Sequence, residues 1–208
     1  MNFFDFSITY GPKFSSAAIT TAQVFVYSAL LAVIISIIFG IMRLSKNIII
    51  QVLATVYIEF YRGTSLIIQM FWIYYVLPLF GIPLPALLAG VLALGMNFGA
   101  YGAEVLRAGI LAVPKGQWEG ALALNFSKAK RMQRIIIPQI YPIILPPAAN
   151  LAVELLKGTA LVSLITLVDL MFVAKQINMM TWLSAQSFGL ALLIYYIMAR
   201  FILVPFLR

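Results

Sequence analysis

The chain lacks several residue types on which enzyme chemistry depends. It has no cysteine, no histidine and only six acidic residues among 208 positions. Without cysteine there is no disulfide framework and no thiolate chemistry. Without histidine the commonest general base and metal ligand is missing. The few carboxylates are spread along the chain, so we expect neither a metal site nor a catalytic centre.

Charge is also scarce. Only 10% of the residues are charged, 63% are hydrophobic and the mean hydropathy is +1.04. A soluble domain has about 25% charged and about 45–50% apolar residues. Most of this chain should therefore lie in lipid. At about 20 residues per span, there is room for roughly five helices and for no separate soluble domain, so we expect one transmembrane domain over residues 1–208.

Five apolar stretches predict the membrane spans. They cover roughly residues 20–42, residues 66–77 with some flanking positions, and residues 84–113, 135–167 and 188–207. The fourth stretch contains four prolines, which predict a broken or bundle-facing helix instead of a straight lipid-facing one. The first 14 residues carry Asp5 and no basic segment, which is not typical of a signal peptide.

The basic residues predict the orientation. We expect one side of the membrane to carry Arg43, Lys46, Arg62, Lys115, Lys128, Lys130, Arg131, Arg134 and Arg208, and the other only Lys13 and Lys175. Because cytoplasmic loops collect Lys and Arg, the N-terminus should lie outside and the C-terminus in the cytoplasm. The same rule accounts for the net charge of +8 without a nucleic-acid partner.

Ionisable residues inside the spans come in pairs spaced i, i+3. The pairs are Glu59 with Arg62, Glu104 with Arg107, and Glu154 with Lys157. Residues at this spacing share a helix face, so neutralisation or gating is favoured over substrate binding. The substrate-pathway candidates are Gln69, Asn97, Tyr101, Asn150 and Glu154. An interhelical hydrogen bond is an equal alternative for Asn97, which lies among small residues.

A polar, basic loop at about residues 114–134 interrupts the apolar stretches. Trp118, Ala121 and Leu122 fall at i, i+3, i+4, which predicts a short helix with one apolar face and Glu119 in its first turn. Asn125 suits the left-handed conformation that ends a helix. Ser127 would cap a second, basic helix. Two short surface helices would bind either a soluble partner or anionic lipid headgroups.

This loop resembles the EAA loop of ATP-binding-cassette (ABC) import permeases, in particular those for polar amino acids. The matching residues are Glu119-Gly120-Ala121, Asn125 and Ile137-Pro138, with Gly120 for the usual Ala and Asn125 for the usual Gly. Three more segments resemble this family in order: residues 57–65, with Ser65 for the usual Pro, residues 100–110 and residues 156–163. Residues 71–78, 121–125 and 161–166 are similar to ectoine and hydroxyectoine permeases, which carry a small zwitterionic solute.

The resemblance implies an all-α type I importer permease in a bacterial inner membrane. Two permease subunits, identical or homologous, would form the pathway by alternating access. Two ATPase subunits would bind at the cytoplasmic side, and an external binding protein would deliver the substrate. The ATPase-coupling residues would be Gln117, Trp118, Glu119, Gly120, Ala121, Leu122 and Asn125.

This chain has no Gly-rich phosphate loop. It would therefore bind no cofactor itself, and ATP and Mg would act in the partner ATPase. The expected cargo is a polar amino acid or an amino-acid-like compatible solute, with ectoine or hydroxyectoine as the specific expectation. Leu151 offers nothing to a guanidinium, which favours a neutral or zwitterionic cargo. The alternative is an ATPase-independent channel or secondary transporter, although the inverted repeat often seen in such carriers is not visible.

Overall fold

The structure, a computed structural model, describes residues 2–203, and that part of the chain is built from helices and turns without a strand. The elements are α1 (Phe3–Met42), α2 (Ile48–Gly63), α3 (Leu66–Phe71), η1 (Trp72–Val76), η2 (Leu77–Phe80), α4 (Ala86–Ala112), α5 (Lys115–Ala123), α6 (Lys128–Arg131), η3 (Met132–Ile136), α7 (Ile137–Gly158), η4 (Thr159–Ile165), α8 (Leu170–Thr181) and α9 (Ser184–Leu203). The all-α prediction is confirmed. Arg208 and the end of the predicted fifth span lie outside the described residues.

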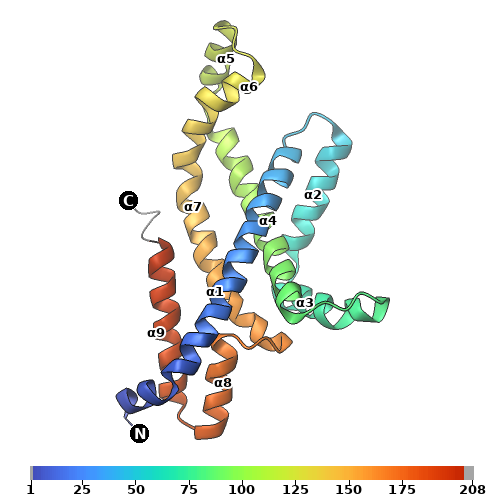
Figure 1. Ribbon diagram of the computed structural model, residues 1–208. Coiled ribbons are helices and arrows are strands. Elements are labelled where there is room, and N and C mark those ends of the chain that lie inside the picture. The colour runs from blue at the N-terminus through green and yellow to red at the C-terminus, as the bar shows by residue number, and fades with distance from the viewer. Residues whose placement is uncertain (1, 204–208) are drawn as a thin grey trace.

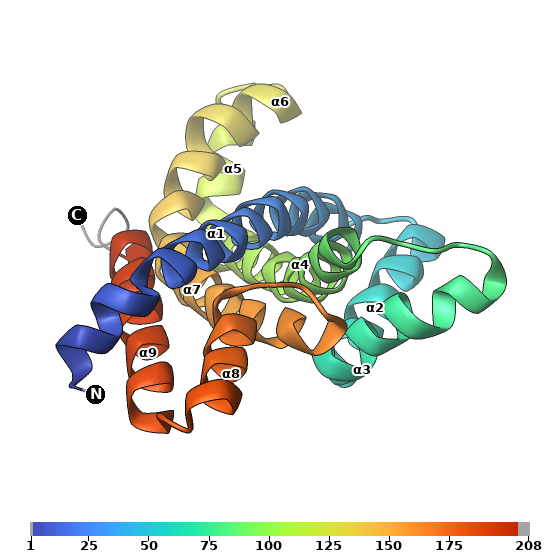
Figure 2. The same cartoon turned by 60° about the horizontal axis from the view of Figure 1, so that its bottom comes forward.

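Helices α1 and α4 lie side by side along much of their length (Figures 1 and 2). Glycines on α4 permit this close approach. A Cβ at Gly95 would lie 2.6 Å from Leu31 Cδ2, and a Cβ at Gly99 would lie 2.5 Å from Ile35 Cγ2. Small residues at such spacing allow helix backbones to pack closely where no hydrophobic effect drives them together.

Helix α1 begins at Phe3, well before the predicted start of the first span at residue 20. The early residues join the helix because they are amphipathic: Phe6 and Phe14 are fully buried and pack with Leu170 and Ile177 of α8. This aromatic segment is therefore part of the folded bundle.

The second span differs from the prediction. Helix α2 is a 16-residue helix that the sequence analysis placed in a loop, because Glu59 and Arg62 lower its apolar character. The predicted span at 66–77 is instead a short helical arm, Leu66–Phe80, bent by 103° from α2. Figures 1 and 2 show this arm running sideways from the end of α2.

The fourth apolar run was predicted to be either broken at its prolines or bundle-facing, and it is not broken at them. Helix α7 continues to Gly158 and only then tightens into the 3₁₀ turn η4. Pro138, Pro142 and Pro146 are spaced by four, so the backbone bonds that they remove lie along one side of the helix. The opposite side keeps its bonds, which accounts for the continuity.

Three helical segments are long and apolar enough to cross a membrane: α1, α4 and the continuous run Lys128–Ile165. The bent pair of α2 and the Leu66–Phe80 arm would supply a fourth. Helix α9 matches the start of the predicted fifth span. The total of five spans and the side on which each terminus lies remain predictions.

Figure 1 shows the α1–α2 turn and the α5–α6 region toward one end of the molecule, and the N-terminus and the α8–α9 turn at the other. Lys46 lies in the α1–α2 turn, as predicted for the basic side. Arg62 does not share that position, because it lies in the last turn of α2, at the far end of that helix.

Helix α8 was not predicted from the sequence. Its N-cap is Asp169, which accepts hydrogen bonds from the backbone N–H groups of Phe172 (2.9 Å) and Met171 (3.2 Å). The Tyr195 hydroxyl donates to the same carboxylate at 3.3 Å. Asp169 is fully buried, and this burial raises its pKa to about 6 against the opposing effect of those hydrogen bonds.

Gly99→Val should separate α1 from α4, because the added methyl groups have no space beside Ile35. We expect a loss of folded monomer, measured by yield and thermal melting in mild detergent. Gly116→Val is the matched control, since nothing lies within 4 Å of its Cβ position. Equal melting temperatures for the two variants would contradict the close α1–α4 contact.

Asp169→Asn should change the pH dependence of stability. In the wild type the folded state holds the Asp169 proton between pH 3.8 and about 6 while the unfolded chain has lost it. Wild-type stability should therefore fall as the pH rises through this interval, whereas Asn retains the helix cap without the charge. As the pH is raised from 3.8 to about 6, the melting temperature of Asp169→Asn should rise relative to that of the wild type. Parallel curves for the two proteins would contradict the raised pKa.

Candidate functional site

The polar loop folds into a short surface helix, α5, which protrudes from the end of the bundle (Figure 1). Trp118 and Ala121 face inward: Trp118 packs against the buried cluster of Val113, Ile136 and Ile140, and Ala121 is buried. Leu122 was predicted on the same face, but it is exposed. The inner face is therefore narrower than the sequence pattern indicated.

Helix α5 begins at Lys115, two residues before the predicted start. Glu119 consequently lies beyond the first turn, where the helix dipole no longer explains its presence. It is exposed, as are Gly120 and Leu122. No atom lies within 4 Å of the Cβ position at Gly120. The outer face of α5 is thus an open surface with one carboxylate, one glycine and one leucine.

The end of α5 follows the prediction. Asn125 has a left-handed backbone with a φ of 55°, and the Ser127 hydroxyl accepts a hydrogen bond from the Lys130 backbone N–H at 3.3 Å. The helix that follows is not a second short element. It passes from α6 through the wider turn η3 directly into α7, so the basic residues form the first turns of a long helix.

Two contacts fix α5 to this long helix. The Gln139 Nε2 donates to Gln117 Oε1 at 3.2 Å, and the Arg131 guanidinium lies 5.8 Å from the centroid of the Trp118 ring. Both contacts join α5 to the first turns of the long helix that leads into α7. The coupling-loop residues thus divide into those that anchor α5 and those that face outward.

Two of the substrate-pathway candidates, Gln69 and Asn97, are brought together and are buried. Asn97 Nδ2 donates to Gln69 Oε1 and to the Tyr61 carbonyl, each at 3.0 Å. Gln69 Nε2 donates to the Tyr61 carbonyl at 3.0 Å and to Thr64 Oγ1 at 2.6 Å. Both side chains stabilise the bend between α2 and α3, because they donate hydrogen bonds to carbonyls at the end of α2 that lack their usual helical partners.

Arg43, directly after α1, joins charged residues of α2 and α4 in one network. Arg107 and Glu104 pair at 2.9 Å, as the spacing predicted. Glu59 does not pair with Arg62 but lies 3.9 Å from Arg43, which also approaches Glu104 at 3.8 Å. Arg43 was not expected in this role, because its partners come from two other helices and no local spacing indicates them.

Of the remaining candidates, Tyr101 lies on α4 one turn after Asn97, and the other two lie on α7. Asn150 and Glu154 are exposed on one face of α7, and neither has a hydrogen-bond or ion-pair partner in the part of the chain that the structure describes. Lys157, one turn after Glu154, is likewise exposed and does not pair with it. We call Asn150, Glu154 and Lys157 the polar face of α7. Tyr101 on α4 is 36% exposed.

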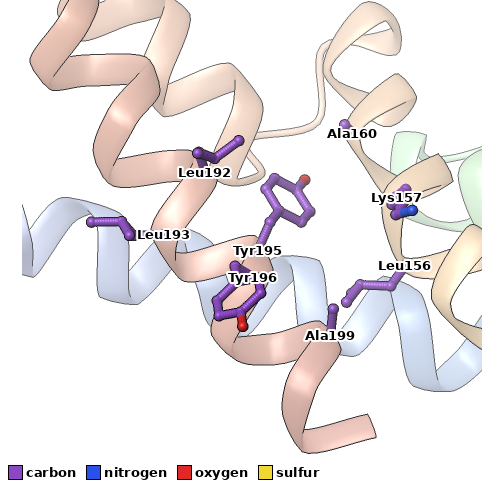
Figure 3. Close-up of a pocket in the computed structure, with 8 residues that line it drawn as sticks. All are labelled: Leu156, Lys157, Ala160, Leu192, Leu193, Tyr195, Tyr196 and Ala199. Atoms are coloured by element: carbon purple, nitrogen blue, oxygen red, sulfur yellow. The ribbon is translucent and has the colours of Figure 1, made fainter. Parts of the chain in front are cut away.

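Beside this face, a groove of about 540 Å³ lies between α7 and α9. Figure 3 shows Tyr195 and Tyr196 of α9 on one side of it and Leu156 and Lys157 on the other. The other residues that line it, Ala160, Leu192, Leu193 and Ala199, are apolar. Of the described residues that line the groove, Lys157 is the one that carries a charge.

Comparison with known proteins decides the family. A model of the binding-protein-dependent transport system inner membrane component matches residues 32–207. The chain belongs to this family of ABC importer permeases. A probable amino-acid ABC transporter permease from Sinorhizobium fredii, y4tF, is 43% identical over 182 residues, covering 85% of this chain and 76% of the relative.

Other relatives agree. The permease is 33% identical over 194 residues to the L-cystine transport system permease protein TcyB of Bacillus subtilis, covering 93% of this chain and 80% of the relative. The crystal structure of an amino acid ABC transporter with histidines superposes with a TM-score of 0.90 at 35% identity, covering 99% and 96% of the two chains. The MetNI methionine transporter shares the fold at 14% identity, with a TM-score of 0.82 and coverage of 95% and 94%.

Membership confirms the type I importer architecture and the inner-membrane location. It also means that the permease is a membrane component of a transporter whose ATPase is a separate subunit and whose substrate arrives on a binding protein.

Asn97→Ala should weaken the bend between α2 and α3, because Gln69 Oε1 loses its donor. We expect a loss of about 1–3 kcal/mol of stability and altered substrate affinity, with ATPase binding unchanged. Gln51→Ala, an exposed amide on α2, is the control. Unchanged uptake by a destabilised Asn97→Ala permease would leave Asn97 with a packing role alone.

Proposed function

We propose that this permease imports a polar amino acid, or an amino-acid-like zwitterion, by alternating access coupled to a separate ATPase through α5. The observation that carries the proposal is the division of α5 into an anchored inner face and an open outer face. Gln117, Trp118 and Ala121 hold the helix, while Glu119, Gly120 and Leu122 face outward. We assign the outer face, ending at Asn125, to the ATPase groove.

Coupling would proceed through α7. Because α5 is fixed to residues 131 and 139, a movement of the ATPase would shift the start of the long helix that carries the polar face. The family supplies the ATPase partner, and the basic end of the molecule is proposed to face the cytoplasm.

The polar face of α7 is proposed to line the substrate pathway. Exposed charges in a span are costly in lipid, so Glu154 and Lys157 need water, substrate or another protein surface beside them. A second permease subunit, identical or homologous, would cover this face and enclose the path. Tyr101 and Asn150 would supply further polar contacts.

The relatives support the cargo class. Their names specify amino acids, among them L-cystine and, for Rickettsia permeases 33–34% identical to this chain, glutamine. An unpaired carboxylate and an unpaired ammonium on one helix face suit a solute that carries both charges. Ectoine remains the narrower proposal, resting on the segment resemblance alone.

Gly120→Trp should uncouple the transporter without unfolding the permease. The Cβ position is open, so the indole would project into the ATPase groove instead of into the bundle. Glu119→Lys should act similarly by reversing the exposed charge. We expect co-purification of the ATPase from native membranes to fall at least tenfold, with the permease still inserted.

Lys46→Gln is the matched control, since this exposed cation lies in the α1–α2 turn and not on α5. Wild-type ATPase recovery and substrate-stimulated uptake in both α5 variants would refute the docking role. Recovery of the wild-type permease without any ATPase would favour an autonomous carrier.

A further inference from the structure

Arg62 is an exposed cation that the permease does not neutralise. By sequence spacing its partner should be Glu59, but Glu59 is directed to Arg43. The ion pairs among the described residues involve Arg43 and Arg107 and leave Arg62 out. No acidic residue occurs between Arg62 and Glu104. An exposed arginine near the end of a membrane helix that pairs with no protein carboxylate is available to water, a lipid phosphate or an anionic solute.

The backbone on both sides of Arg62 is fixed. The preceding carbonyl, that of Tyr61, accepts hydrogen bonds from both Gln69 and Asn97. Two residues later, Thr64 accepts from Gln69 through its hydroxyl at 2.6 Å and its carbonyl at 3.3 Å. The buried amides therefore act as positioning residues for Arg62, and pre-organisation of this kind lowers the entropic cost of binding.

The guanidinium is also oriented. Its Cζ lies 5.4 Å from the centroid of the Tyr101 ring on α4. A guanidinium over an aromatic face keeps its N–H donors available at its edge, where they match a carboxylate in a forked arrangement. Nothing lies within 4 Å of the Cβ position at Gly63, so the space beside Arg62 is open.

An aromatic strip connects Arg62 to α7. The rings of Tyr101 and Phe98 lie 6.4 Å apart, and the Cβ position of Gly158 is 3.4 Å from the Phe98 ring. Gly158 follows Glu154 by four residues and therefore lies on a neighbouring part of α7. Contacts through Tyr101 and Phe98 thus link Arg62 on α2 to the helix that carries Glu154.

We propose that Arg62 binds the carboxylate of the transported solute. This inference rests on the proposed function, since it names the group that receives the negative end of an amino acid or similar zwitterion in the pathway. Tyr101 holds the guanidinium, Gln69 and Asn97 hold its backbone, and the aromatic strip carries the apolar part of the solute toward Glu154.

The test is direct binding to the purified permease–ATPase complex in lipid nanodiscs without the binding protein, which would impose its own selectivity. Labelled L-glutamine, L-cystine and ectoine are each compared with the corresponding carboxamide. The wild type should bind at least one carboxylate form. Arg62→Gln should weaken that binding by about 10- to 100-fold, the loss expected for a charge-assisted hydrogen bond, and leave carboxamide binding unchanged.

Lys46→Gln is the matched control, because Lys46 is an exposed cation in the turn at the other end of α2. Arg62→Lys keeps the charge without the fork, so it should give an intermediate loss, and it serves as the test if Arg62→Gln does not assemble.

Equal binding by Arg62→Gln and Lys46→Gln would overturn the role of Arg62 while the proposed function stands. Equal weakening of carboxylate and carboxamide would also overturn it, because that pattern indicates a structural defect. Failure of the wild-type complex to bind or transport any of the solutes would instead refute the proposed function.

Discussion

Polar groups inside an apolar bundle must find partners within the protein, and this constraint organises the permease. Helix α2, at 16 residues and about 24 Å, is shorter than the roughly 30 Å hydrocarbon core. The last carbonyls of α2 therefore need donors from within the protein. Gln69 and Asn97 satisfy them and permit the 103° bend. At the start of α8, the buried Asp169 carboxylate satisfies unpaired backbone N–H groups by accepting hydrogen bonds from them.

Because most polar groups in the bundle are paired, the few that have no partner are candidates for a functional role. In the described residues almost every buried amide and most intramembrane charges are paired, often across helices, as in the network of Arg43, Glu59 and Glu104. Among the intramembrane charges of the described residues, Arg62, Glu154 and Lys157 have no ion pair, and Ser28, Ser187 and one Arg43 nitrogen are buried without a hydrogen-bond partner. The three charges lie on elements that the proposed pathway would use, and their opposite signs match those of a zwitterion.

The coupling loop depends on a different balance. Trp118 is held between the bundle end and Arg131, so α5 is rigidly attached although most of its surface is open. A helix that is attached on one face and exposed on the other suits mechanical coupling better than a flexible loop would. The helical run that follows α5, from Lys128 to Gly158, continues through the membrane region.

Composition and local spacing alone determined the membrane class, the approximate places of α1, α4 and α7, the surface helix α5 and its Asn125 terminator. These features depend on hydropathy and on neighbours within a few residues. Only the tertiary structure decided the bend after α2 and the burial of Phe6 and Phe14. It also decided that Glu59 pairs with Arg43 and that Arg62 has no ion pair among the described residues. Those outcomes depend on which helices meet, and in a bundle the nearest partner in space outweighs the nearest partner in sequence.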